Sequence, residues 1–402
     1  MTLPSSGAIS LSAVNTEFGG STPIGLKTYY RGGGYVPNTS NNSGVATSGA
    51  INMNSFHSAS AFLGFTTPTS LYANGVTYGV DCSSGGVYCV VGGYYTSGPT
   101  NNNAAFWLSS NGTTWGAPTT LLNSSTKIPF LSSVAWNQTL GVFIAVGQDG
   151  NNNGVIYTIT TGGTATLQAT ISNFFISCVA VNSSGLTVVA GQYSSLIATV
   201  YSSNGTTWTS PVTISGTGSS PTLYALTVNP AGYWSGVGAY FNVGPSAQTP
   251  IFISSSNGTS FTGGSMGVPP ATSGVIMAGV VWNAKLNQFV AIGSYGPSYY
   301  SLSNSTGSTW AVPSLASGTY GVNPGGKGSS CLAINAAGLM ISAAQNGSAD
   351  QGYFKSTNGT TWTYTLLVTS QVNSFLAIAC SANTSQRYIA VGANNINFSV
   401  ST

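Results

Sequence analysis

Apolar residues along most of the chain occur as pairs of short runs separated by a turn. The clearest pairs span 134–147 and 280–293, where each has an apolar run, a turn at Asn and a second apolar run ending in Gly. Short apolar runs bounded by turn residues predict two β-strands joined by a hairpin. We name these strands A and B. Seven such hairpins can be counted, and they begin near Tyr78, Val134, Val179, Leu226, Val280, Leu332 and Ile378.

A second motif follows each of the first six hairpins. It reads Ser-Ser-Asn-Gly-Thr-Thr-Trp at 109–115 and 202–208, with close variants at 255–261, 303–310 and 356–362 and a worn copy at 161–167. Asn-Gly is a strong hairpin signal because both residues tolerate positive φ. The motif therefore predicts a turn between two further strands, C and D. We expect its final aromatic residue to be a structural repeat residue that buries its face against the neighbouring sheet, at Trp115, Trp208, Phe261, Trp310 and Trp362.

Four strands in a repeat of roughly 50 residues are typical of a propeller blade. We therefore expect an all-β fold in which residues 65–402 form a seven-bladed β-propeller. The chain ends at 397–402 with a segment that resembles strand C of the last blade. We expect residues 65–71 to supply the missing strand D and to close the ring, because closure removes exposed strand edges.

Residues 1–64 contain no blade motif. They carry a short duplication of their own, in which 6–14 (Ser-Gly-Ala-Ile-Ser-Leu-Ser-Ala-Val) echoes 48–56 (Ser-Gly-Ala-Ile-Asn-Met-Asn-Ser-Phe). The segment is short and rich in glycine, so it can bury little surface alone. We expect a small attachment module that docks on a partner or on another copy of the chain.

The repeated Asn-Gly motif resembles the Asp-box of sialidase-type and related propellers, Ser-x-Asp-x-Gly-x-x-Trp. Asn replaces Asp here, and four copies are one residue shorter; the copy at 303–310 has full length, with Ser305 at the Asp position. In that family the box is a structural turn between strands C and D, away from the catalytic face. The resemblance therefore implies a fold and no sialidase activity.

Residues 1–64 resemble an N-terminal module of virion structural proteins and tail fibres of tailed phages, especially aquatic ones. The matching segments are 4–20, 21–33 and 48–56. The resemblance implies a location on the outside of the phage particle and attachment to other virion proteins. Fibre proteins are commonly oligomeric, so we also expect a homo-oligomer. The residues expected to carry attachment are Ile9, Leu11, Phe18, Tyr29, Tyr30, Arg31, Ile51 and Phe56.

The chain has only seven Lys or Arg and four Asp or Glu, 3% of its residues. Seven scattered cations form no patch for nucleic acid. The acids Glu17, Asp81, Asp149 and Asp350 fall in different elements, and the one histidine lies in the N-terminal segment, so we expect no enzyme. No apolar run is long enough to span a membrane, and the start of the chain does not look like a secretory signal. The five cysteines form no zinc signature and are expected to be buried, with a Cys82–Cys89 disulfide as the alternative.

Binding remains the best-supported class of function. The loops between strands B and C are the longest and carry Tyr, Asn and Asp without positive charge, which suits a neutral sugar because rings stack on it and amides or carboxylates bind its hydroxyls. Solvated turns without a ligand are the alternative. We expect no cofactor or metal, although Asp149 or Asp350 with Asn oxygens could hold an ion. The candidate ligand residues are Tyr94, Tyr95, Asn102, Asp149, Asn151, Tyr240, Tyr295, Tyr299 and Asp350.

These observations favour a phage tail fibre or adhesin whose propeller recognises a host surface glycan. The alternative is a capsid or tail decoration protein in which the propeller is a rigid spacer or cement.

Overall fold

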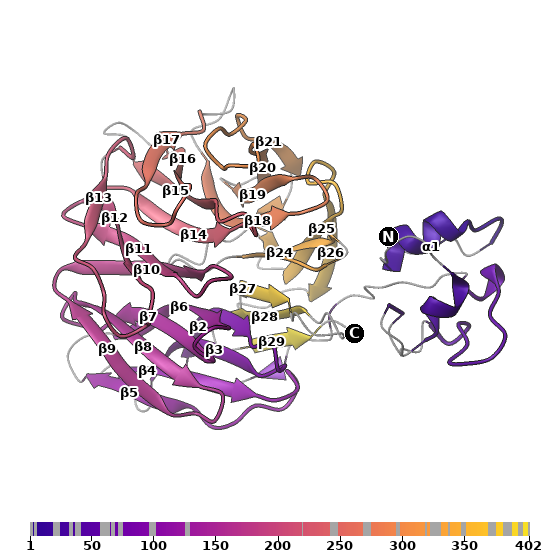
Figure 1. The fold of residues 1–402 in the computed structure, drawn as a ribbon, viewed down its shortest axis with the longest axis horizontal. Helices are drawn as coiled ribbons and strands as arrows, with labels where there is room; N and C mark the ends of the chain where they lie inside the picture. The colour runs from indigo at the N-terminus through magenta and orange to yellow at the C-terminus, as the bar shows by residue number, and fades with distance from the viewer. Residues whose placement is uncertain are drawn as a thin grey trace.

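The chain folds into antiparallel sheets arranged around a common centre (Figure 1). The computed structural model describes residues 3, 6–18, 25–31, 35–36, 42–56, 65, 69–70, 75–95, 102–124, 129–218, 220–241, 248–267, 275–294, 298–317, 320–321, 331–336, 338–346, 351–368, 375–380, 388–392 and 397–400. Its described strands fall into seven sheets, six with four strands and one with five. The all-β propeller that the repeats predict is confirmed.

Each sheet is a meander in which strands A to D follow one another, and the first four sheets from the N-terminus keep this order without exception. Their strands are β2(Gly75–Cys82), β3(Tyr88–Tyr95), β4(Asn102–Ser109) and β5(Thr119–Ser124); β6(Phe130–Asn137), β7(Val142–Gln148), β8(Gly154–Thr160) and β9(Ala165–Ile171); β10(Phe174–Val181), β11(Thr187–Tyr193), β12(Leu196–Ser202) and β13(Val212–Ile214); and β14(Thr222–Val228), β15(Trp234–Phe241), β16(Gln248–Ser255) and β17(Thr262–Ser265).

The remaining three sheets follow the same plan with two variations. In one sheet strand A is split into two short pieces, which both pair with strand B, and in the last sheet strand D comes from far away in the sequence. These sheets contain β18(Ile276–Asn283), β19(Gln288–Ser294), β20(Ser298–Leu302) and β21(Ser314–Ser317); β22(Tyr320–Gly321), β23(Leu332–Ile334), β24(Met340–Asn346), β25(Gln351–Ser356) and β26(Thr363–Val368); and β27(Phe375–Cys380), β28(Tyr388–Gly392), β29(Asn397–Val400) and β1(Thr69–Ser70).

The two ends of the propeller sequence meet in this last sheet. Strand β1 pairs with β29 in the register Thr69 with Phe398 and Ser70 with Asn397. A second link joins the first and last sheets, because the Thr77 hydroxyl donates to the carbonyl oxygen of Gly392 at 2.9 Å. The pairing predicted for the segment at 65–71 is therefore present, although the described strand is only two residues long.

The glycine that ends strand B of each clear hairpin has a steric cause. Strand A contains a β-bulge in this region, as between Ile176 and Cys178, opposite Gly191. A Cβ atom on Gly191 would lie 2.1 Å from the carbonyl oxygen of Phe175. The same approach, at 1.9 to 2.1 Å, occurs at Gly92, Gly147, Gly238 and Gly293. The bulge lets strand A curve towards the centre of the ring, and only glycine leaves room for it.

The core of the propeller lies between neighbouring sheets. One cluster, for example, joins Val91 and Phe106 of the first sheet to Leu131 and Phe143 of the second. Because each apolar face needs the next sheet to cover it, a single blade cannot bury its core alone.

The described part of the N-terminal module consists of short helices and turns. It contains α1(Leu11–Phe18) and the 3-10 helices η1(Leu26–Tyr29) and η3(Met53–Phe56). The Ser10 hydroxyl caps α1 by accepting from the amide of Ala13 at 3.0 Å. The module has its own core of buried side chains, formed by Leu3, Val14, Phe18, Tyr29, Val36, Val45 and Phe56. The expectation that it buries little by itself is therefore wrong.

All five cysteines are free thiols, four of them buried and Cys380 half-buried. The alternative of a Cys82–Cys89 disulfide is therefore wrong. The helices in the described part of the chain are too short or too polar to cross a membrane.

Candidate functional site

The Asn-Gly motifs form one repeated turn between strands C and D. In the copy at 202–208, the Ser202 hydroxyl oxygen accepts from the amide of Gly205 at 2.9 Å, and the Asn204 side-chain oxygen accepts from the amides of Thr206 and Thr207 at 3.0 and 2.8 Å. The copies at 109–115, 255–261 and 356–362 repeat these bonds at 2.8 to 3.1 Å. The side chains satisfy the backbone of the turn itself, so the motif acts as a structural cap.

The glycine of each turn also allows the turn to pack closely against neighbouring side chains, because it has no Cβ atom. Gly205 has a φ of +72°, and a Cβ there would lie 2.7 Å from Cδ1 of Leu140 in the neighbouring hairpin. In the longer copy, the Asn304 side-chain oxygen accepts from the amide of Ser308 at 3.1 Å. Asn304, rather than Ser305, therefore has the capping role there.

The aromatic residues that end the motif pack beside these turns. Trp310 and Trp362 are buried, and their indole N–H groups donate to the carbonyl oxygens of Gly307 and Gly359, both at 3.0 Å. Trp115, Trp208 and Phe261 are half-buried and pack against core clusters. All five contribute to packing and none lies in a described cavity.

Two of the residues predicted to bind a sugar belong to the core instead. Tyr94 lies in β3 and Tyr299 in β20, and both side chains are buried. The Tyr94 hydroxyl is hydrogen-bonded to that of Thr120 at 2.7 Å, and its ring packs edge-on against Trp107 at 6.2 Å between centroids. The prediction that these two rings stand on a loop is wrong, because the strands extend further than the sequence pattern indicated.

Four other predicted ligand residues are not placed by the structure. Tyr295 and Asp350 lie outside the described residues, and so does His57. Tyr95 and Asn102 face each other as a register pair of β3 and β4, but their side chains also lie outside the described part.

Asp149 organises the described B–C loop that joins β7 to β8. Its Oδ1 accepts from the amides of Asn151 and Asn153 at 2.7 and 3.1 Å, and its Oδ2 accepts from the Asn153 side chain at 2.8 Å. Partial desolvation raises the pKa of this carboxyl, but the hydrogen bonds from Asn153 and Asn151 outweigh it and hold the pKa below its usual value. The loop leaves Asn151 exposed, so this amide is available to a ligand.

Tyr240 lies near the end of β15, with its side chain half-buried. Its ring covers the turn that precedes β14, so that a Cβ on Gly218 would lie 2.3 Å from Cγ of Tyr240. The described candidates for a sugar site therefore reduce to Asn151, Asp149 and Tyr240, and no described cavity joins them.

The predicted attachment residues divide into two groups. Phe18, Tyr29 and Phe56 form the aromatic centre of the module and are buried, with the ring of Tyr29 edge-on to Phe56 at 6.3 Å between centroids. Because these side chains are buried, they pack the core of the module, and their predicted part in attachment stays a prediction.

The other attachment residues keep part of their surface accessible. Ile9, Leu11 and Ile51 pack on the edge of the module core, and the Tyr30 hydroxyl donates to the carbonyl oxygen of Gly49. Arg31 forms a bridge with Val36. These residues remain candidates for contact with a partner.

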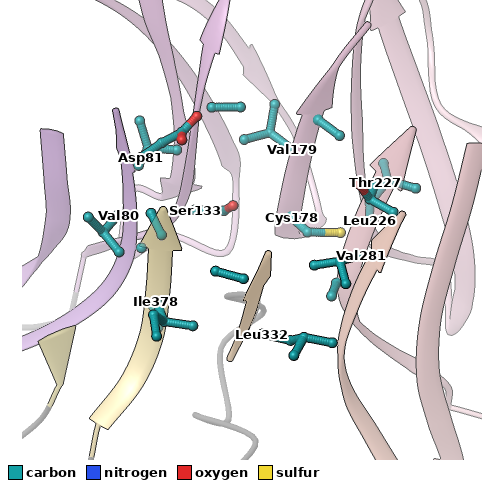
Figure 2. A pocket seen from close by; sticks show the side chains of 18 of the residues that line it. Val80, Asp81, Ser133, Cys178, Val179, Leu226, Thr227, Val281, Leu332 and Ile378 are labelled. Carbon is teal, nitrogen blue, oxygen red and sulfur yellow. The ribbon is translucent and has the colours of Figure 1, made fainter. Parts of the chain in front are cut away.

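A site that sequence reasoning missed lies at the centre of the ring. A cavity of about 310 Å³ is lined by strand A of every sheet, from Gly79–Asp81 in β2 to Ala377–Cys380 in β27. Figure 2 shows the Asp81 carboxylate on one side of this cavity, with the aliphatic side chains of Val179, Leu226 and Leu332 on other sides. Asp81 is the one charged residue among those that line it.

The carboxylate of Asp81 is held by two backbone amides. Its Oδ1 accepts from Cys82 at 2.8 Å, and its Oδ2 accepts from Trp136 of the next sheet at 2.7 Å. Burial raises the pKa of Asp81 to about 6, although both hydrogen bonds act to lower it. The only sequence signal for this site is that Asp81 interrupts an apolar strand A. Closure of the ring is what brings the seven strands together.

The sheets, their hairpin order and the repeated C–D turns define a β-propeller. Solved structures with this fold include YCF48 bound to D1 peptide (14% identity, covering 83% of this chain and 96% of that one, TM-score 0.55) and YCF48 from Cyanidioschyzon merolae (13%, 84% and 98%, TM-score 0.54). Another is the BP39L lectin from Burkholderia pseudomallei (12%, 81% and 94%, TM-score 0.56). Neither the scan of protein-family models nor the search of curated proteins gave a match. At these identities the likeness concerns the fold alone.

Proposed function

We propose that this chain is a virion structural protein of a tailed phage, a tail fibre or adhesin whose propeller binds a neutral glycan on the host surface. Residues 1–64 attach it to other virion proteins, and the seven sheets are the seven blades of one ring closed by β1. The observation that carries the proposal is the division of the chain. A module with its own aromatic core bears the virion-type motif, and a nearly uncharged propeller follows it.

The glycan-binding part rests on the B–C loops. The loop at 149–153 is held by Asp149 and presents the Asn151 amide, a group that binds sugar hydroxyls. A lectin shares the propeller fold, so the architecture is compatible with sugar recognition. The surface acts by neutral recognition rather than by catalysis, since Asp81 on β2 lines the central cavity whereas Asp149 belongs to the loop between β7 and β8 and does not line that cavity.

The alternative is a decoration or scaffold protein in which the propeller is a spacer. The burial of Tyr94 and Tyr299 favours it, because two of the rings expected to stack on a sugar are used for packing. In that case no glycan binds, and the copies are spread over the particle surface.

Two measurements separate these proposals. Deletion of residues 1–64 should leave a propeller that folds but does not enter particles, as detected by mass spectrometry of purified virions. Normal incorporation would contradict the attachment role.

On a glycan array, Asn151→Ala should weaken binding about tenfold, whereas Asn204→Ala, in a C–D turn away from the B–C loops, should not. Failure of the unsubstituted chain to bind any glycan would favour the spacer.

A further inference from the structure

The central cavity contains one carboxylate, that of Asp81, which the propeller fold does not require. In the register of the seven hairpins, the position of Asp81 corresponds to Ala135, Ala180, Thr227, Val281, Ala333 and Ala379, and all of these line the same cavity. Six of the seven A strands therefore carry an uncharged residue at the position of Asp81. The acid in β2 is an addition to the repeat.

The carboxylate also lacks a countercharge. Its two hydrogen bonds come from backbone amides, and none comes from a Lys or Arg in the described part of the chain. An ionised carboxylate offers about four acceptor positions, so about two remain for a ligand. A charge among aliphatic side chains is unfavourable unless it is paired, which favours a cationic ligand.

The residues that line the cavity are more accessible at the end near the A–B turns than at the other end. Beyond Asp81, towards the A–B turns, it is lined by half-buried Trp136, Val181, Val228 and Ile334. At its other end the lining residues Ser133, Cys178 and Ala225 are buried. A ligand can therefore enter from the A–B turn face, which is opposite to the face of the B–C loops.

From these observations we propose that the cavity binds a primary ammonium group on a short aliphatic stem, with Asp81 as its counterion. The ammonium carries three donors for the free positions of the carboxylate, and the stem lies against the valine and leucine walls. A volume of about 310 Å³ accommodates such a group. The ligand is either a free alkylamine or the lysine side chain of a partner polypeptide.

A metal ion fits the site less well. No group of three or more His, Cys, Asp or Glu in the described chain is placed to hold one. The thiols of Cys82 on the same strand and Cys89 on β3 interact electrostatically with Asp81, and that of Cys380 on β27 interacts with Cys82. Burial raises the pKa of all three, to about 12 for Cys82 and Cys380, so these thiols stay neutral near pH 7.

The test is calorimetric titration of the full chain at pH 7.5 with n-butylammonium, N-acetyl-lysinamide and the uncharged analogue n-butanol. We expect saturable binding of an ammonium probe and at least tenfold weaker binding of n-butanol. Binding of N-acetyl-lysinamide as tight as that of n-butylammonium supports a lysine of a partner chain, and binding of n-butylammonium alone supports a free amine. No binding of either ammonium, or equal binding of n-butanol, overturns the proposal.

Variants separate the charge from the packing. Asp81→Asn should weaken ammonium binding at least tenfold, whereas Asp149→Asn, which removes a carboxylate outside the cavity, should leave it unchanged. Because Asp81→Asn also disturbs two backbone hydrogen bonds, Ala333→Leu provides a second test that fills the cavity and keeps the acid. It should also abolish binding. Unchanged binding in either cavity variant, with the fold verified by thermal melting, overturns the proposal. Glycan binding on the opposite face is measured separately, so the two proposals can fail independently.

Discussion

The N-terminal module and the propeller both contain repeated sequence, but they use repetition differently. In the module, the equivalent residues Val14 and Phe56 of the duplication converge on one small core. In the propeller, equivalent residues of successive repeats build separate clusters, most of them shared by two neighbouring sheets and one by three. Loss of one core side chain therefore removes a large part of the module's core, but in the propeller it affects only one of several clusters between sheets.

The largest expected effect is on the module. Phe56→Ala should cost about 4 kcal/mol, which is comparable to the whole stability of a domain of this size. We expect loss of the module's tertiary signals in near-ultraviolet circular dichroism or NMR, with an unchanged melting temperature of the propeller. The matched variant Phe289→Ala, at an equally buried ring, should lower the propeller's melting temperature while the ring stays folded. If both variants lower the same transition equally, the two regions form one cooperative unit.

The next effect tests the β-bulge that recurs in strand A of the propeller sheets. Gly191→Ala places a methyl group 2.1 Å from the carbonyl oxygen of Phe175, and we expect a loss of about 3 kcal/mol in the free energy of unfolding. Gly162→Ala is the control, since its nearest atom would lie 3.8 Å away. Equal denaturation midpoints for the two variants would show that strand A can shift without cost.

The pH dependence of stability distinguishes Asp81 from Asp149. Folding raises the pKa of Asp81 to about 6, so the native state holds its proton over a pH range in which the unfolded chain has lost it. The free energy of unfolding should therefore fall as the pH rises from about 4 to about 6, by on the order of 2 kcal/mol. Folding lowers the pKa of Asp149, so its contribution is present above the unfolded value and is lost as the pH falls through the folded one.

Chemical denaturation at several pH values measures these slopes. Asp81→Asn should remove the decline between pH 4 and 6, and Asp149→Asn should leave it in place. A decline that persists in Asp81→Asn would assign it to another group.

The smallest effect concerns the C–D turns. Asn204→Ala removes an acceptor for two backbone amides, as in the loss of a helix cap, and should cost about 1 kcal/mol. Asn204→Asp keeps the acceptor and should be nearly neutral. A melting temperature that falls equally in both variants would mean that the amide N–H₂ group is also needed.

Much of the fold could be predicted from local pattern because the repeats carry local causes. The Asn-Gly turns and the glycine that ends strand B each report a backbone geometry that few other residues allow. The lengths of the strands were less predictable. Tyr94 and Tyr299 follow apolar runs and resemble loop residues in the sequence, but pairing with the next strand continues past them. These errors in strand length affected the predicted ligand residues most, because the sequence alone does not distinguish a tyrosine on a loop from a tyrosine in the core.

The sequence by itself determined the strand–turn–strand pattern of the propeller and the position of the C–D turns, because these depend on residues close together along the chain. The tertiary structure alone decided which attachment residues are buried in the module and that Asp81 faces a cavity shared by seven strands. Burial in the module arises when Val14 and Phe56 meet in one core, and the cavity arises when segments more than 300 residues apart meet, as Thr77 and Gly392 do. No local pattern encodes the space that remains at the centre of a closed ring.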